Sequence, residues 1–292
     1  MYLATVIARQ GKTYIVEDEQ QKQHQCHVRS QAHEAVCGDR VLCESQRQSY
    51  DVIASIQPRV NQLTRIDNFQ RTKTLAANID HMVIVIAPVP NYSHLLIDKY
   101  LACAELNRCK ASLVINKSEY LSQYKVDIRQ LEDIYLPIVE HFIIASAHLG
   151  CGISALKHTL MTQKSILVGQ SGVGKSSIIN SLFGNTHIKV GSLSENIQQG
   201  KHTTTNACAY PLGKNGKIID SPGVRNFTPI LSNKYQAVNG FREFKDHIGQ
   251  CKFANCQHLD EPGCAIKAAV ESGYISTQRY ASYRAICAEV SS

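Results

Sequence analysis

The stretch Ser165-Ile-Leu-Val-Gly-Gln-Ser-Gly-Val-Gly-Lys-Ser-Ser-Ile178 decides the fold of this 292-residue chain. Its central part, Gly169–Ser176, fits G-x-x-x-x-G-K-[ST], a glycine-rich loop that binds phosphate between a strand and a helix. The context fits as well, because the apolar run Ser165–Val168 precedes the loop and the helix start Ile178–Leu182 follows it. The sequence therefore predicts an α/β domain that binds a nucleoside triphosphate.

The chemistry of this loop gives its residues distinct roles. Glycines let the backbone curl so that successive N–H groups point at phosphate oxygens, and the following helix adds its positive end. Lys175 reaches the outer phosphates, and the Ser176 hydroxyl is a ligand for Mg²⁺. The candidate nucleotide-binding residues of the loop are Gly169, Gln170, Ser171, Gly172, Val173, Gly174, Lys175, Ser176 and Ser177.

Strand and helix patterns alternate on both sides of this loop. His81–Ala87 is a continuous apolar run, as a buried parallel strand requires. Further strands and helices are expected, in chain order, at Ser93–Leu106 (helix), Ala111–Ile115 (strand), Tyr124–Tyr135 (helix), Phe142–Ala145 (strand) and Lys217–Ile219 (strand). This alternation indicates a parallel sheet covered by helices.

Two strand-end segments bear on the choice of base. Asn116-Lys117-Ser118-Glu119 is similar to the guanine-reading N-K-x-D of GTPases, with glutamate in place of aspartate. The carboxylate there accepts hydrogen bonds from the guanine N1 and N2 donors, which adenine lacks. Ser146-Ala147 is similar to the element whose backbone N–H meets guanine O6. Because the Glu119 carboxylate lies one methylene further out, GTP is favoured and an ATP-using enzyme stays open.

The order of these motifs along the chain is unusual. Asp220-Ser-Pro-Gly223 ends the last predicted strand, where Asp220 can hold Mg²⁺ through water and the Gly223 N–H can meet the γ-phosphate. In Ras-like GTPases the phosphate loop comes first and the base-reading loop comes late. Here Asn116–Glu119 and Ser146-Ala147 precede Gly169–Ser177. The sequence therefore predicts a circularly permuted GTPase domain, which is possible where the original termini lie close together.

A polar segment, Gly200–Thr205, lies between the phosphate loop and Asp220. A threonine hydroxyl at this point completes the Mg²⁺ shell, and Thr204 is our candidate. Val224 stands where many GTPases have a glutamine that orients the attacking water. His202 is therefore the candidate catalytic residue, with an ordinary loop histidine as the alternative.

The first segment of the chain has a different character. Short β-favouring runs follow one another, at Tyr2–Ile7, Thr13–Val16, Gln25–Val28, Asp39–Cys43 and Tyr50–Ile56. Five short strands in so few residues predict a small β-barrel of the OB type, although another small β-module fits the same pattern. Taken alone, Arg29, Arg40, Arg47, Tyr14 and Tyr50 fit ordinary solvated surface residues of such a module.

A cluster of metal ligands lies near the C-terminus. Cys251-x4-Cys256-x-His258-x5-Cys264 places three thiols and one imidazole in a short stretch. Cys₃His is a complete tetrahedral shell for a structural zinc ion, and the histidine favours zinc over an iron–sulfur cluster. The last part, Ala265–Val290, is expected to be helical with a break at Gly273. These patterns divide the chain into a β-barrel at 1–66, a permuted GTPase domain at 67–229 and a zinc-binding helical domain at 230–292.

Composition sets wider limits. Hydrophobic residues make up 43% and charged residues 19% of the chain, which is typical of a globular protein. The formal net charge is +7, and most of the basic excess falls in the central region while 1–66 is nearly neutral. The sequence shows neither a signal peptide nor an apolar run of roughly 18 residues, so a cytoplasmic protein without a membrane partner is expected. With 11 cysteines in such a chain, metal binding is favoured over disulfides.

The motifs together resemble one family. Besides the barrel, the permuted GTPase centre and the Cys₃His module, the chain contains Pro58-Arg59…Asn61…Leu63…Arg65, Gly200–Thr205 and Asp220-Ser-Pro-Gly-Val-Arg-Asn-Phe227. This combination resembles the RsgA (YjeQ) family, the small-ribosomal-subunit biogenesis GTPases of bacteria. Similarity runs over nearly the whole chain.

The resemblance implies a slow GTPase that the small (30S) ribosomal subunit stimulates late in its maturation. It also implies contact with 16S rRNA near the decoding region, GTP and GDP as ligands, one structural Zn²⁺, Mg²⁺ with the nucleotide, and His202 as the catalytic residue. For the barrel, the resemblance implies RNA contact through Arg29, Arg40 and Arg47, with Tyr14 or Tyr50 for base stacking. A monomer is expected. The residues themselves leave one further reading open, a nucleotide-switched RNA- or ribosome-binding module with negligible turnover.

Overall fold

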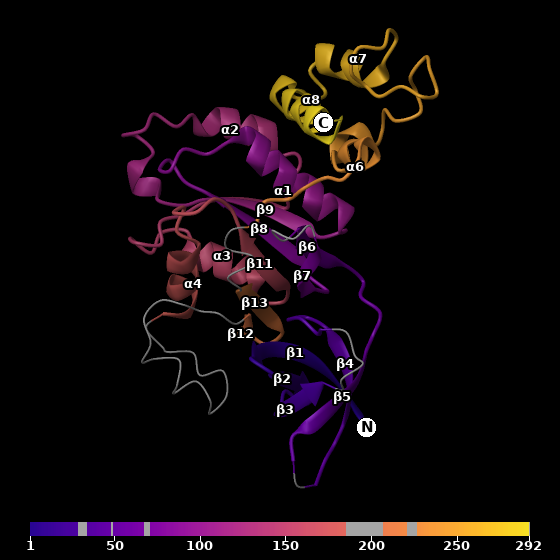
Figure 1. Cartoon of the computed structure of the whole chain (residues 1–292). Helices are drawn as coiled ribbons and strands as arrows, with labels where there is room; N and C mark the ends of the chain where they lie inside the picture. Colours follow the sequence, from indigo (N-terminus) through magenta and orange to yellow (C-terminus); the bar gives the residue numbers. More distant parts are fainter. Residues whose placement is uncertain (29–33, 48, 67–70, 185–206, 221–226, 292) are drawn as a thin grey trace.

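A computed structural model of the chain describes residues 1–28, 34–47, 49–66, 71–184, 207–220 and 227–291. Three parts follow one another along the molecule in Figure 1. The N-terminal strands form a barrel at one end, the α/β part lies in the middle, and the C-terminal helices lie at the other end. This order confirms the predicted fold class.

Five strands form the barrel. They are β1 (Tyr2–Gln10), β2 (Thr13–Asp18), β3 (Gln23–Val28), β4 (Arg40–Glu44) and β5 (Asp51–Ile56). Their order is β1-β2-β3-β5-β4, and a further pairing of β1 with β4 closes the barrel. The β3–β5 pair is parallel and the other pairs are antiparallel. Small apolar side chains such as Val6, Val16 and Val41 are fully buried inside it. The OB-type barrel expected from the strand pattern is confirmed.

A sheet of six strands forms the centre of the α/β part, in the order β10-β9-β8-β11-β13-β12. Its strands are β8 (His81–Ile86), β9 (Lys110–Ile115), β10 (His141–Ile144), β11 (Lys164–Val168), β12 (Cys208–Leu212) and β13 (Gly216–Asp220). All neighbours are parallel except β12, which runs antiparallel to β13. The connecting helices are α1 (His94–Leu106), α2 (Ile128–Tyr135), α3 (Ile153–Leu160) and α4 (Lys175–Phe183), with a 3₁₀ turn η1 (Ser118–Tyr120).

Helices cover both faces of this sheet. Successive side chains of a strand point to opposite faces, so a strand that is buried on both sides must be apolar throughout. In β8 the side chains of Met82 and Ile84 pack in the cluster that contains α1 and α2. Val83 and Val85 pack in the cluster that contains α3 and α4. The two pairs of helices lie on opposite sides of the strands in Figure 1.

Three local features differ from the sequence expectations. Strand β12 has no counterpart among them, because Pro211 and the short length of the run weaken its pattern. A hairpin of β6 (Gln62–Ile66) and β7 (Thr72–Ala77) was also missed, and the proposed boundary between residues 66 and 67 falls within it. Helix α2 begins at Ile128 rather than Tyr124, since Asp127 caps it by accepting from the Gln130 N–H.

Backbone and side-chain contacts join the barrel to the α/β part. Strand β1 pairs antiparallel with β12, through Ala8 opposite Cys208, so all the barrel strands and the central sheet form one 11-stranded sheet. Lys217 of β13 forms an ion pair with Glu17 of β2, and the Asn78 side chain donates to the Gly38 carbonyl at 2.9 Å. The barrel is therefore fixed to the α/β part by backbone pairing as well as by side chains.

The C-terminal part is helical. It contains α6 (Lys234–Asn239), the 3₁₀ turn η3 (Arg242–Phe244), α7 (Ala265–Glu271) and α8 (Thr277–Ser291). Gly273, at φ 81°, lies between α7 and α8, as expected from the sequence. Arg279 of α8 is buried and donates to Asp98 of α1 at 2.7 Å, which holds this part against the central domain. Among the described residues, no helix combines the length and apolar character needed to cross a membrane.

Candidate nucleotide-binding site and metal centre

The phosphate loop joins β11 to α4, as expected. Its glycines adopt backbone angles that side chains rarely allow: φ is 138° at Gly169, 84° at Gly172 and 94° at Gly174. A Cβ at Gly169 would lie 2.1 Å from the carbonyl oxygen of Val85, so the loop also needs glycine for close approach to β8. The N-terminus of α4 begins at Lys175, which turns its free N–H groups towards the loop.

Lys175 and the serines that follow it differ in exposure. The Lys175 ammonium donates to the carbonyl oxygens of Gly169 at 2.7 Å and Gln170 at 2.9 Å, and the residue is only 8% exposed. These contacts hold a positive charge at the mouth of the loop. Ser176 and Ser177 are exposed. This is the arrangement that a phosphate group and its Mg²⁺ need, with a fixed cation inside and hydroxyl groups at the surface.

Asn116 connects the phosphate loop with both candidate base-reading segments. Its side-chain amide donates to the Val173 carbonyl at 2.9 Å and accepts from the Ala147 N–H at 3.0 Å. The residue is buried at the end of β9. A Cβ at Gly174 would lie 2.3 Å from its Nδ2. Three segments far apart in the sequence therefore meet at one amide group.

Lys117 adopts a left-handed backbone conformation at φ 62°, and its ammonium donates to the Val89 carbonyl at 2.7 Å. Pro90, which follows Val89, lies against the phosphate loop: a Cβ added at Gly172 would be 3.4 Å from the Pro90 ring. The loop after β8 thus touches both the base-reading segment and the phosphate loop. Sequence reasoning missed this loop, although its place at the carboxyl end of a parallel strand was a usable signal.

Glu119 and Ser146 lie together. A hydrogen bond from the Ser146 hydroxyl lowers the pKa of the Glu119 carboxyl below its ordinary value. Ser146 is fully buried, whereas Glu119 is exposed. An ionised, exposed carboxylate beside the Asn116 cluster is able to accept hydrogen bonds from a base that carries two N–H donors.

The remaining candidates follow β13. Asp220 is the last residue of this strand, which pairs with β11, and is 8% exposed. The candidates Gly223, His202 and Thr204 lie outside the described residues, as do Val224 and the rest of 200–205.

The four predicted metal ligands come together in the C-terminal part. Ligand atoms of Cys251, Cys256, His258 and Cys264 all lie within 4.8 Å of one another. The Cys251 and Cys264 sulfurs are 4.0 Å apart, and each lies 3.4–3.5 Å from Nδ1 of His258. In a tetrahedral zinc site the ligand atoms are about 3.5–3.8 Å apart, as Zn–S and Zn–N bond lengths require. The donor set and its spacing therefore fit a structural zinc ion.

The backbone around these ligands is held by further contacts. The Ala265 N–H donates to the Cys251 sulfur at 3.3 Å, a contact that stabilises a thiolate. The Glu261 carboxylate accepts from the N–H groups of Gln257 and Leu259, both at 2.9 Å. These bonds, mainly the one from the Gln257 N–H, lower the pKa of the Glu261 carboxyl to about 2. The ligand loop is thus shaped by its own polar contacts on either side of His258.

Comparison with known proteins identifies this arrangement. A family model described as "RsgA GTPase" matches residues 56–229. The chain belongs to the RsgA GTPase family. A curated relative from Hahella chejuensis, named small ribosomal subunit biogenesis GTPase RsgA, is 41% identical over 88% of this chain and 74% of its own. A relative of the same name from Chromohalobacter salexigens is 39% identical over 97% and 85%.

Two solved structures show the same fold. The crystal structure of YjeQ from Thermotoga maritima has a TM-score of 0.81 and 31% identity, and covers 99% of this chain and 98% of that chain. YloQ, described as a circularly permuted GTPase, has a TM-score of 0.76 at 22% identity, over 100% and 95%. Membership of the RsgA family makes this chain a GTPase, and the predicted circular permutation is confirmed.

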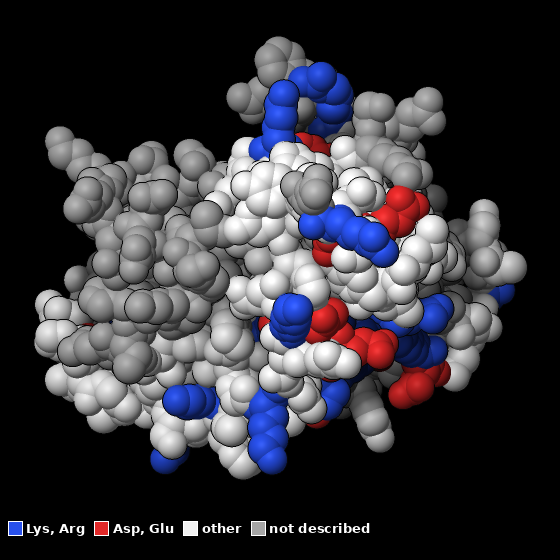
Figure 2. All heavy atoms as spheres, turned by 90° about the horizontal axis from the view of Figure 1, so that it is seen from below, with Lys and Arg blue, Asp and Glu red and all other residues white. Residues whose placement is uncertain are grey.

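The barrel surface differs in part from the sequence expectation for an RNA-binding face. Tyr14 was expected to be available for base stacking, but it is only 4% exposed, because its side chain points into the barrel core. Arg40 and Arg47 are exposed, and Arg29 lies outside the described residues. Figure 2 views this end of the RsgA-family chain: basic side chains are spread across it, with acidic ones among them. Tyr50 is half exposed and lies 4.8 Å from the His27 ring.

We expect Gly174→Ala to weaken binding of both GTP and GDP by at least tenfold. The new methyl group would collide with the Asn116 side chain. Alanine is also strained at φ 94°, and this backbone strain alone costs about 1–3 kcal/mol. Equilibrium binding of a fluorescent nucleotide measures the effect.

The matched control is Gly11→Ala in the barrel. Gly11 also has a positive φ, of 60°, but a Cβ there meets nothing within 4 Å. This variant should lose some stability and keep its nucleotide affinity. Equal nucleotide affinity of the Gly174 variant and the wild type would contradict the assigned contact.

Proposed function

We propose that this protein is a Mg²⁺-dependent GTPase that acts in late maturation of the small ribosomal subunit, and that the subunit stimulates its hydrolysis of GTP. The observation that carries the proposal is the junction at Asn116, which brings a phosphate loop and a base-reading carboxylate together. The curated relatives named small ribosomal subunit biogenesis GTPases support the process. GTP, GDP, the 30S subunit and its 16S rRNA are the proposed partners of a cytoplasmic monomer.

The residues divide the work of phosphoryl transfer. The backbone of 169–177 and the Lys175 ammonium hold the phosphates, and the N-terminus of α4 stabilises their charge. Ser176 and Thr204 would hold Mg²⁺, which neutralises charge on the phosphate oxygens, while Asp220 orients its water ligands. Gly223 would donate its N–H to the γ-phosphate. Asn116, Lys117, Ser118, Glu119, Ser146 and Ala147 hold the guanine.

The attacking water needs a group to orient it. Val224 has an apolar side chain and cannot do so. The proposal assigns this role to His202, which the sequence places shortly before the Mg²⁺ candidate Thr204. GTP would order 200–205 and favour the subunit-bound conformation, and hydrolysis would release it.

The central test is turnover of GTP with and without purified 30S subunits. We expect an increase of at least tenfold on addition of the subunits, with large (50S) subunits as the control. Absence of stimulation in a protein that still binds GTP would refute the ribosomal role and leave a slow GTPase.

His202→Ala, measured in the same assay, should abolish most of the stimulated rate. If the stimulated rate stays unchanged, His202 orients no water.

Guanine selection is tested by displacement of labelled GTP. Unlabelled GTP should displace it and a large excess of ATP should not. Glu119→Gln should weaken GTP binding by about 10–100-fold, since charged hydrogen bonds are worth about 1.5–3 kcal/mol. Asp133→Asn, on the exposed face of α2, is the control for loss of one negative charge. Equal displacement by ATP and GTP would instead favour an ATP-using enzyme.

The zinc assignment predicts about one zinc per purified chain by elemental analysis. A chelator should make the C-terminal part susceptible to proteolysis, because the free energy of metal binding stabilises small metal-bound folds. Cys256→Ser should lower the zinc content, whereas Cys151→Ser should not, since Cys151 is an exposed cysteine far from the cluster in sequence. A metal-free chain with an intact C-terminal part would contradict the assignment.

A further inference from the structure

Two tyrosines of α8, Tyr280 and Tyr283, have no role in the assignments above. They lie three residues apart on one face of the helix, and their stacked rings have centroids 6.2 Å apart. Tyr283 is fully buried, and its ring packs edge to face against the rings of Phe241 and Phe244. Both hydroxyl groups reach the loop that carries the metal ligand His258.

The hydroxyl groups donate to three consecutive carbonyl oxygens of that loop. Tyr283 donates to the Gln257 carbonyl at 2.6 Å. Tyr280 donates to the carbonyls of His258 at 2.9 Å and Leu259 at 3.2 Å. A hydroxyl group has one proton, so the Tyr280 proton is shared between the two oxygens. Helix α8 therefore binds the peptide oxygens immediately around a metal ligand.

The peptide nitrogens of the same loop are held by Glu261, whose carboxylate accepts from the Gln257 and Leu259 N–H groups at 2.9 Å. Between these two residues, His258 has a φ of 59°, a left-handed conformation that residues other than glycine rarely adopt. Such a conformation costs about 1–3 kcal/mol and persists only where surrounding contacts determine it. The tyrosine hydroxyls and Glu261 supply these contacts, so they fix the backbone from which the imidazole reaches the two nearest sulfurs.

The residue before Tyr280 joins α8 to the central domain. Arg279 is 1% exposed, and its guanidinium donates to Asp98 of α1 at 2.7 Å. The next residue of α1, Lys99, donates to both carboxylate oxygens of Glu289 near the end of α8, at 2.6 and 2.8 Å. The same helix therefore holds the metal loop through its tyrosines and α1 through its charged residues.

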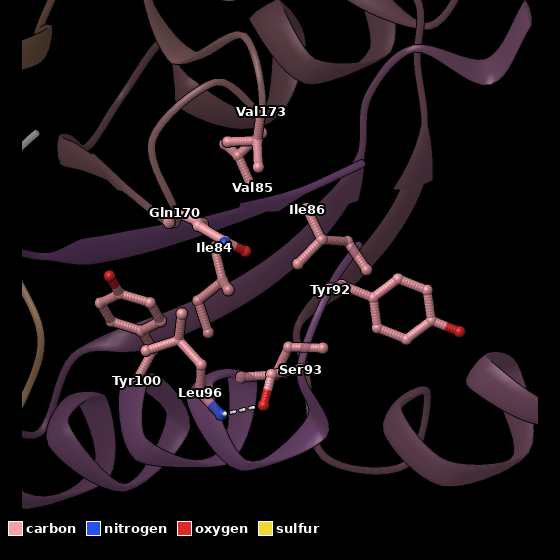
Figure 3. A pocket seen from close by; sticks show the side chains of 11 residues that line it. Ile84, Val85, Ile86, Tyr92, Ser93, Leu96, Tyr100, Gln170 and Val173 are labelled. Carbon is pink, nitrogen blue, oxygen red and sulfur yellow. Dashed lines mark hydrogen bonds between the residues drawn. The ribbon is translucent and has the colours of Figure 1, made fainter. Parts of the chain in front are cut away.

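Helix α1 in turn lies against the phosphate loop. Leu96 and Tyr100 of α1 line a small cavity together with Gln170 of the loop, and Figure 3 shows the three side chains around it. The Ser93 hydroxyl caps the helix at this end by accepting from the Leu96 N–H. A shift of α1 would therefore alter the wall on which the phosphate loop rests.

We propose that the Tyr280 and Tyr283 hydroxyl groups couple zinc binding to the seating of α1 behind the nucleotide site. They are positioning groups for the metal, because they hold the loop in the conformation in which its ligands converge. The metal-bound loop in return holds α8, and α8 holds α1 through Arg279. The inference rests on the zinc assignment and adds that the metal stabilises a helix of the GTPase domain as well as its own loop. Such coupling is reciprocal, so a loss on one side weakens the other.

The first test uses Tyr280→Phe and Tyr283→Phe in the full chain, which keep the rings and remove only the oxygens. Zinc affinity is measured by competition with a coloured chelator of known affinity. We expect the dissociation constant for zinc to rise about 10–100-fold in each variant, the usual effect of losing a group that orients metal ligands. A tyrosine that only filled space would leave this constant unchanged.

Tyr274→Phe is the matched control. Tyr274 lies in the same part of the chain, between α7 and α8, and is 84% exposed. This variant should keep the zinc affinity of the wild type. Wild-type affinity in both α8 variants would overturn the proposal, and so would an equal loss in the control. A wild-type chain that binds no zinc would refute the zinc assignment itself.

The second test needs no variant. Amide hydrogen exchange is followed by mass spectrometry in the wild-type chain, with zinc bound and after its removal by a chelator. We expect α8 to lose protection and α1 to lose part of its protection, because local stability follows the contacts that hold a segment. Strands β1 to β5 of the barrel are the internal reference and should not change. Loss of protection confined to 251–264, with α1 unchanged, would show that zinc and α1 are not coupled.

Discussion

The nucleotide site depends on one buried amide. Asn116 lies at the end of β9 and bonds to the backbone on both sides, to Val173 in the phosphate loop and to Ala147 after β10. Only a glycine at position 174 leaves room for it. A residue with one donor group and one acceptor group is suited to this place, because it satisfies a carbonyl and an N–H that would otherwise be buried without partners. Loops from three strands are set relative to one another by this single side chain.

Local patterns were enough to predict much of the fold and the site. Gly169–Ser176 and the Cys251–Cys264 cluster are short motifs whose chemistry is complete within a few residues, and both lie where the sequence placed them. The barrel and the parallel sheet follow from alternating and continuous apolar runs. The permuted order was readable because each motif follows its own strand. None of these inferences needed knowledge of which distant segments touch.

What the sequence could not reveal depends on contacts between distant segments. The burial of Tyr14 follows from the barrel register, in which Tyr14 lies opposite Cys26 inside a closed barrel. Strand β12 exists because β13 and β1 flank it, rather than through its own propensity. Tyr100 looks like an ordinary apolar-face residue of α1 until the fold brings the Phe227 carbonyl to its hydroxyl.

Helix α1 serves two parts of the molecule. The Tyr100 hydroxyl donates to the Phe227 carbonyl, while Asp98, one half-turn earlier, pairs with the buried Arg279 of the C-terminal part. Arg279 also bonds to Glu243 and lies 4.3 Å from the centre of the Phe241 ring. Breaking a buried ion pair on one side costs several kcal/mol, so the C-terminal part and this helix are expected to move as one body.

The pairing of β1 with β12 has a mechanical consequence for the whole chain. Two domains joined by a linker alone can swing independently, but backbone hydrogen bonds across a shared sheet transmit force in both directions. A force on the barrel surface is transmitted from Ala8 of β1 to Cys208 of β12 through their pairing. Pairing of β12 with β13 then carries it to Asp220. A large particle that bound both the barrel and the C-terminal helices would contact the molecule at its two ends, on either side of the nucleotide-binding domain.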